Sequence, residues 1–92
     1  MCAIFLKIVI PYRNYKRVKE IVEGLEKEGH RPLYIRRDVL FKERRELDPV
    51  EVVFLLDMPP YEVRKLRKKI SLAIRGTLGF YIMYPLKKNT SS

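Results

Sequence analysis

The 92-residue chain has one cysteine, no tryptophan, no glutamine and only two asparagines. A single cysteine cannot form an internal disulfide or build a zinc site, which fits a reducing compartment. Long apolar runs are missing, so we expect no membrane-spanning helix and no membrane partner. Few amides together with 34% charged residues are typical of hyperthermophile proteins. The composition predicts a cytoplasmic protein from a thermophilic archaeon, or from a virus acting in the cytoplasm of such a host.

An apolar run over residues 2–10 is the part of the sequence that most resembles a targeting signal. Lys7 interrupts it, and no small-residue cleavage site follows it. Its β-branched residues and its end at Pro11 favour a buried strand over residues 3–10. A second strand, over residues 50–56, is apolar on both faces. Two such strands are expected at the centre of one sheet.

Apolar residues at helical spacing predict two helices, over residues 15–28 and 60–75. Asn14 is a suitable N-cap for the first helix, and Gly29 is a suitable stop signal after it. Prolines suit the first turn of the second helix, and we expect Asp57 to cap it. The two apolar stripes consist of Val18, Ile21, Val22 and Leu25, and of Val63, Leu66, Ile70, Ala73 and Ile74.

Two shorter strands, over residues 32–37 and 79–85, complete the pattern. Residues 38–49 fit either an extended hairpin with a charged tip or a short helix, and the hairpin is favoured. The order of elements predicts an α+β, ferredoxin-like βαββαβ two-layer sandwich, in which a four-stranded antiparallel sheet carries two helices on one face. We expect a single domain over residues 1–86, followed by a disordered polar tail over residues 87–92.

Positive charge is the strongest functional signal in the sequence. Twenty Lys and Arg against eleven Asp and Glu give a net charge of +9, which favours DNA or RNA as the partner. The surplus is local, because residues 61–76 hold six basic side chains and one acidic one, whereas residues 15–29 hold four of each. The cations of the second helix span about 16 Å, enough to follow several phosphates. They are Arg64, Lys65, Arg67, Lys68, Lys69 and Arg75.

A second basic group lies at the start of the first helix and consists of Arg13, Lys16, Arg17 and Lys19. Positive charge there opposes the helix macrodipole, which is unfavourable unless an anion lies nearby. These residues could therefore complete a phosphate site. Ion pairing with neighbouring carboxylates is an equal alternative. A third basic group, over residues 31–45, is diluted by acidic residues and is typical of a protected edge strand.

An apolar surface is expected on the side of the sheet away from the helices. Alternation along the strands predicts its members, which are Phe5, Lys7, Val9, Val53, Leu55, Tyr81 and Met83. Exposed apolar surfaces of this kind are usually interfaces. Because the residues are mainly aliphatic, pairing of two copies is favoured over stacking of nucleic-acid bases. The sequence therefore predicts a homodimer.

Residues suited to catalysis are scarce. His30 is the only histidine, and its place just beyond a helix indicates a structural role. No Ser/His/Asp or Cys/His set can be assembled, and no glycine-rich phosphate loop occurs. We therefore expect a protein that is not an enzyme and that uses no metal, no cofactor and no small-molecule substrate.

The chain length, the order of elements and the closing strand over residues 81–86 resemble the small ferredoxin-like nuclease subunit of CRISPR adaptation complexes. That family places a metal-binding aspartate at the end of its first strand, where this sequence reads Ile10-Pro11-Tyr12. The resemblance therefore implies at most a divergent metal-dependent nuclease. The leading hypothesis is a homodimer that binds nucleic acid without sequence preference. The alternative is a protein-interaction or regulatory module, such as a viral one, with an acidic partner.

Overall fold

Two ten-residue strands, β1 (Cys2–Pro11) and β3 (Pro49–Met58), form the centre of the sheet in the computed structural model, which describes residues 1–86. They pair antiparallel along their whole length, from Cys2 opposite Met58 to Pro11 opposite Pro49. Both strands are rich in Val and Ile, which fit the pleated surface of a sheet. The expected tail lies outside the described residues.

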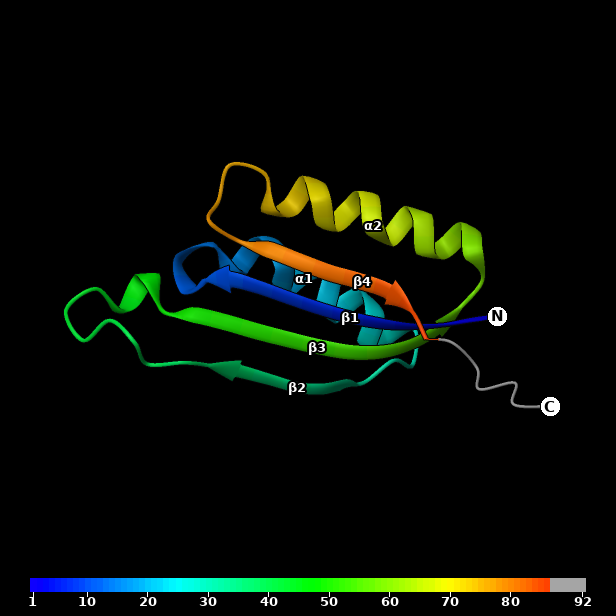
Figure 1. Cartoon of the computed structure of the whole chain (residues 1–92), viewed down its shortest axis with the longest axis horizontal. Helices are drawn as coiled ribbons and strands as arrows, with labels where there is room; N and C mark the ends of the chain where they lie inside the picture. The colour runs from blue at the N-terminus through cyan, green and yellow to red at the C-terminus, as the bar shows by residue number, and fades with distance from the viewer. Residues whose placement is uncertain (87–92) are drawn as a thin grey trace.

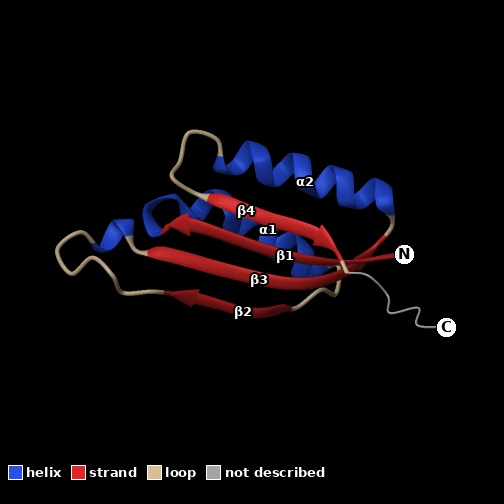
Figure 2. Cartoon of the chain, in the orientation of Figure 1, coloured by secondary structure: helices blue, strands red, loops and turns tan. Residues whose placement is uncertain are grey.

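The edge strands are β2 (Pro32–Arg37), which pairs with β3, and β4 (Phe80–Pro85), which pairs with β1. Helix α1 (Tyr15–Lys27) connects β1 to β2, and helix α2 (Pro60–Ile74) connects β3 to β4 (Figure 1). The strand order β2-β3-β1-β4, all antiparallel, confirms the predicted ferredoxin-like fold and its central pair (Figure 2).

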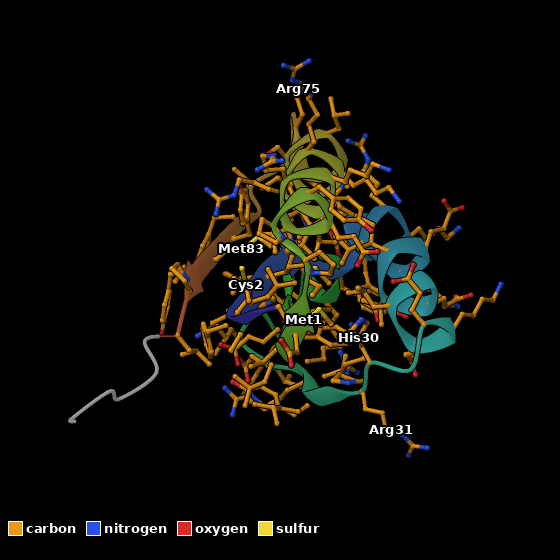
Figure 3. The ribbon with its side chains drawn as sticks, turned by 90° about the vertical axis from the view of Figure 1, so that its right-hand side faces the viewer. Met1, Cys2, His30, Arg31, Arg75 and Met83 are labelled. Atoms are coloured by element: carbon orange, nitrogen blue, oxygen red, sulfur yellow. The ribbon has the colours of Figure 1, made fainter. Side chains whose placement is uncertain are left out.

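Both helices lie on one side of the sheet, as the view turned by 90° shows (Figure 3). The core fills the space between the two layers, because every second residue of β1 and β3 points toward the helices. Its sheet residues are Ile4, Leu6, Ile8, Ile10, Val50, Val52, Phe54, Leu56 and Met58. Its helix residues are Val18, Val22, Leu25, Val63, Leu66 and Ile70. Most of the two predicted apolar stripes thus faces the core, whereas Ile21 and Ile74 pack at its margin and Ala73 is not part of it.

The helix ends follow the expected signals in part. Gly29 has a φ of 92°, and the next N–H, of His30, donates to the carbonyl of Leu25 at 2.9 Å, which closes α1. Asn14 occupies the N-cap position without a side-chain hydrogen bond. The expected cap by Asp57 is wrong, because β3 continues to Met58 and keeps Asp57 in the sheet.

Residues 38–49 do not extend the hairpin, so that prediction is wrong. They form an irregular loop and a short 3-10 helix, η2 (Arg45–Leu47), arranged around Asp48. The buried Asp48 carboxylate accepts hydrogen bonds from the backbone N–H groups of Leu40 (3.2 Å) and Phe41 (3.0 Å). The Arg37 Nε lies 3.5 Å from its other oxygen. Charge-assisted bonds to one buried carboxylate therefore replace the strand ladder here.

Replacement of Gly79 by alanine is expected to destabilise the fold. The added Cβ would lie 2.9 Å from the Val9 carbonyl oxygen and 3.0 Å from Ile10 Cγ1. Such a clash typically costs about 1–3 kcal/mol of the free energy of unfolding. Gly24→Ala is the matched control, because nothing lies within 4 Å of its Cβ and it should gain about 0.5–1 kcal/mol. Urea unfolding measures both, and equal responses would contradict the packing described for Gly79.

Asp48 predicts a specific acid sensitivity. The Phe41 and Leu40 N–H groups, together with nearby Arg37, hold the pKa of Asp48 below its usual 3.8. Because the folded pKa is the lower one, the stabilisation is complete above the unfolded value and disappears as pH falls through the folded value. Asp48→Asn should unfold more easily at neutral pH and lose less further stability between about pH 5 and pH 2.

The exposed Glu43 is the control for this substitution, because it makes no ion pair among residues 1–86. Glu43→Gln should follow the parent protein in thermal unfolding followed by circular dichroism across the same pH range. An Asp48→Asn protein with the full acid sensitivity of the parent would show that other carboxylates cause the loss.

Candidate nucleic-acid interface and open sheet face

The six predicted cations of α2 and its C-terminus are all exposed. Among residues 1–86 none of them lies within ion-pair distance of a carboxylate. Helix α2 presents them because Val63, Leu66 and Ile70 anchor its opposite side in the core. The helix therefore carries positive charge that the described part of the chain does not neutralise.

The structure divides these cations between two sides of α2. Lys65 and Lys69 line a groove between α1 and α2. Arg64, Arg67 and Lys68 do not line it, and helical geometry places them on the opposite side, which we call the outer flank. The outer flank faces the β4 edge of the molecule, where the Ser71 hydroxyl lies 3.0 Å from the Tyr81 hydroxyl.

The start of α1 and the end of α2 meet, because the two helices run antiparallel. The Arg17 guanidinium donates a hydrogen bond to the Arg75 carbonyl at 2.9 Å, and this places a cation at the negative end of the α2 dipole. Arg17 thus has a structural partner that the sequence did not indicate. Arg13 and Lys16 are exposed, and the Arg75 side chain extends away from the body of the protein (Figure 3).

The third basic group is largely paired with carboxylates: four of its six cations form ion pairs, and Arg31 and Lys42 form none among residues 1–86. Arg36 pairs with Glu51 and, at 3.1 Å, with Asp38. Arg44 Nε lies 2.6 Å from Glu46, and this hydrogen bond lowers the pKa of Glu46 below its usual value. The ion pairs of the described residues gather on β1, β2, β3 and the loop after β2. The surplus of positive charge therefore lies in the helix layer.

The side of the sheet away from the helices, which we call the open sheet face, carries five of the seven predicted residues. Pairing of β1 with β3 sets Lys7 opposite Val53 and Phe5 opposite Leu55, and Val9 points the same way. Tyr81 and Met83 were predicted wrongly, because they pair with Ile8 and Leu6 and pack against the core. Their places are taken by Phe80, Ile82 and Tyr84.

Every residue of β4 before Pro85 is apolar or aromatic, so its sequence shows no alternation that would identify the buried side. Only its pairing register with β1 decides which side chains face outward, and a shift of one residue exchanges the two faces. The outward side chains of Phe80, Ile82 and Tyr84 are 51%, 43% and 46% exposed. The Tyr84 ring stacks on Phe5, with ring centres 5.1 Å apart.

A charge network crosses the open sheet face. Glu51, on β3, is almost fully buried between Lys7 on β1, at 3.1 Å, and Arg36 on β2. The hydrogen bond from Lys7, followed by that from Arg36, lowers the pKa of Glu51 below its usual value. The cations on this face are therefore paired with carboxylates, and the rest of the face is apolar.

Among residues 1–86 no group of three or more His, Cys, Asp or Glu side chains is placed to hold a metal ion. In the same range, no helix is long and apolar enough to cross a membrane.

No protein-family model matches the sequence, and no curated protein matches it significantly. Solved structures do match. The C-terminal domain of the MgtC protein from Mycobacterium tuberculosis superposes with a TM-score of 0.58 at 13% identity, covering 99% of this chain and 95% of that one. A formyltetrahydrofolate deformylase from Pseudomonas putida KT2440 gives 0.56 at 10% identity over 89% of this chain. This chain spans 28% of the deformylase, and at such identities the likeness shows the fold alone.

Proposed function

We propose that the protein binds nucleic acid through the outer flank of α2 and acts as a homodimer joined across the open sheet face. The observation that carries the proposal is the separation of charges. The arginines of β2 and of the loop after it are paired with carboxylates, whereas the outer flank has no carboxylate partner among residues 1–86. Phosphates are the partners that such a row of cations attracts most strongly.

The outer flank contacts the phosphate backbone and not the base edges. Arg64, Arg67 and Lys68 lie within about 6 Å along the helix axis, so they cover two or three adjacent phosphates. The extended Arg75 lengthens this surface at the end of α2. Clustered Lys and Arg on phosphates carry no sequence information, so binding is largely independent of sequence.

The open sheet face supports self-association better than nucleic-acid binding. Lys7 and Arg36 are paired with Glu51 there, so phosphates would compete with an existing carboxylate. The remaining side chains are apolar, and Leu55, which pairs with Phe5, is 48% exposed. Two such sheets can pack about 10 Å apart with interdigitated side chains. Because the helices lie on the other side, this dimer has its two outer flanks on opposite surfaces, where it can bridge two nucleic-acid segments.

The triple substitution Arg64→Ala, Arg67→Ala and Lys68→Ala should weaken binding to a duplex of about 20 base pairs and reduce its salt dependence. Each lost phosphate contact removes about 0.9 from the slope of log K against log salt concentration, so the slope should fall by about 2–3. Fluorescence anisotropy at several salt concentrations measures it. Full retention of affinity and slope would overturn the outer flank as the binding surface.

A matched control removes three exposed cations elsewhere, through Lys27→Ala, Arg31→Ala and Lys42→Ala. Both triple variants lose the same net charge, so they separate a local surface from a general effect of basicity. The control should retain most of the affinity. An equal loss in the two variants would mean that the net charge of +9, and not the outer flank, attracts the nucleic acid.

Leu55→Glu should break the dimer without unfolding the protomer, because the side chain is half exposed in the single chain and would place a carboxylate between the joined faces. Sedimentation equilibrium should show the dimer dissociation constant rising by about 100-fold or more. Leu78→Glu, at an exposed position outside the strands, is the control and should stay dimeric. A parent protein that sediments as a monomer at all concentrations would refute the dimer.

A further inference from the structure

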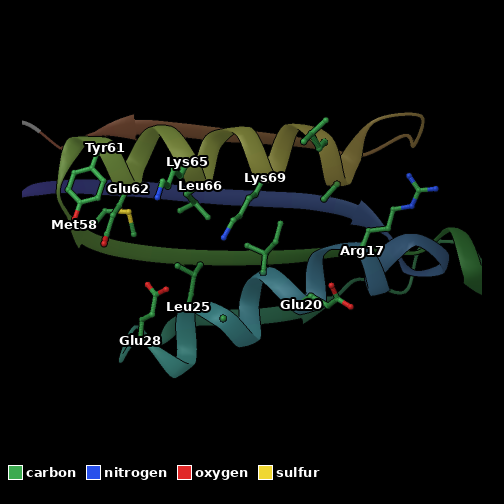
Figure 4. Close-up of a pocket in the computed structure, with 14 residues that line it drawn as sticks. Arg17, Glu20, Leu25, Glu28, Met58, Tyr61, Glu62, Lys65, Leu66 and Lys69 are labelled. Atoms are coloured by element: carbon green, nitrogen blue, oxygen red, sulfur yellow. The ribbon is translucent and has the colours of Figure 1, made fainter.

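A groove of about 690 Å³ runs between α1 and α2 on the surface of the helix layer (Figure 4). Its base is apolar and is formed by Ile21, Leu25, Met58, Leu66 and Ala73. In the middle of α1, Gly24 leaves the wall without a side chain, and nothing lies within 4 Å of the position its Cβ would take. Glycine inside a helix costs about 1 kcal/mol relative to alanine, so this opening exists at the expense of stability.

Charged side chains line the groove in a definite order. Glu28 from α1 and Glu62 from α2 lie at one end, near Tyr61 (Figure 4). Lys65 and Lys69 follow along α2, about one and two turns further on. Among residues 1–86, none of these four groups forms an ion pair, although carboxylates and ammonium groups share the same groove. Glu20 and Arg17, both from α1, line the groove farther from this acidic end. The groove thus has an acidic end, a basic middle and a mixed far end, and no ion pair among residues 1–86 joins these groups.

The position of Glu28 adds to this charge pattern. It caps the C-terminus of α1, where the helix macrodipole is negative, and it shares the end of the groove with Glu62. A carboxylate in that place is unfavourable unless a cation lies nearby, and Lys27, the basic residue of the last turn, does not line the groove. The groove therefore favours a cation at this end of its occupant and carboxylates beside the two lysines.

We propose that the groove binds one amphipathic α-helix of a partner protein. The helix would present small apolar side chains to Gly24 and Ala73, a basic side chain to Glu28 and Glu62, and acidic side chains to Lys65 and Lys69. From Glu62 to Ala73, α2 extends about 16 Å, which matches about three turns of a docked helix. Recognition of an amphipathic helix by an apolar groove is a common mode of binding.

Two exposed apolar side chains lie where such a helix would need anchors. Tyr61, at the acidic end, is 54% exposed, and Leu72, near the other end, is 62% exposed. Both line the groove, and neither belongs to the core cluster. A nucleic acid is a poor occupant, because the three carboxylates that line the groove offset its three cations and would repel phosphates beside them. This site is separate from the outer flank and does not depend on it.

Three labelled helical peptides of about 14 residues with the same apolar side test the proposal by fluorescence anisotropy. The first has a basic residue followed by acidic residues one and two turns later, the second is wholly acidic on its charged positions, and the third is wholly basic. The mixed peptide should bind at least about 10-fold more tightly than either of the others. The tightest binding by the acidic peptide would show that net charge alone attracts it, and would overturn the proposal. Absence of binding by all three at about 1 mM would also overturn it.

Two variants of the protein make the result specific to the groove. Gly24→Leu fills the opening while improving helix propensity, and it should weaken the mixed peptide by about 10-fold or more. Glu28→Lys with Glu62→Lys should transfer the preference to the acidic peptide. Unchanged peptide binding in both variants would place the peptide elsewhere. A Gly24→Leu protein that loses its dimer would identify a second copy as the occupant and overturn the helix of a partner.

Failure of this proposal and failure of nucleic-acid binding can be told apart. The outer-flank triple variant should bind the mixed peptide as the parent does, whereas Gly24→Leu should bind duplex DNA as the parent does. Loss of both ligands in either variant would indicate one shared surface and would contradict the separation of the two sites.

Discussion

The antiparallel pairing of β1 with β3 over ten residues is the constraint on which the rest of the structure depends. Once this register is set, alternation assigns every side chain of the two strands to the helix layer or to the open sheet face. Ile8 and Val52 meet in the core, whereas Lys7 and Val53 meet on the other side. Both faces are apolar, so the helices can cover only one of them. The other remains available for a second copy.

Among residues 1–86, ion pairs and most unpaired cations lie in different layers of the protein. Glu51 lies within the sheet and holds Lys7 and Arg36 together across three strands, and Asp48 organises the end of the sheet with Arg37 and the loop before η2. Most of the carboxylates of the helix layer lie on α1, so α2 retains its cations. The chemistry of the protein surface therefore differs from one layer to the other: apolar on the sheet, basic on the outer flank, and mixed in the groove.

The sequence was sufficient for the elements whose local pattern agrees with their place in the fold. The helices show a periodic stripe, and β1 and β3 are apolar on both faces as central strands should be. It was insufficient for β4, because a uniformly apolar strand has no local signal for its buried side. It was also insufficient for residues 38–49, where six other charged side chains mask the one that matters, Asp48. Only the fold shows that this carboxylate meets backbone donors.

The groove could not be predicted because its walls lie far apart in the sequence. Two features of the sequence belong to the groove. Gly24 lies in the first helix away from its apolar stripe, and Leu72 is an exposed apolar residue among cations. Their shared cause appears only when α1 and α2 are placed side by side. The division of the α2 cations into two sets could not be predicted for the same reason. Only the position of α1 beside α2 determines which cations line the groove and which lie on the outer flank.

The central claim is that positive charge on the outer flank of α2, unpaired within residues 1–86, forms the nucleic-acid surface. Nuclear magnetic resonance tests this claim most directly. A titration of the isotope-labelled protein with a short DNA duplex at low salt, followed by amide chemical shifts, identifies the contacted residues individually. We predict that the largest changes fall on Arg64, Arg67, Lys68 and Arg75, and that the amides of β2 and of the loop after it change little. Changes centred on Arg36, Arg44 and Arg45, or spread evenly over all basic residues, would contradict it.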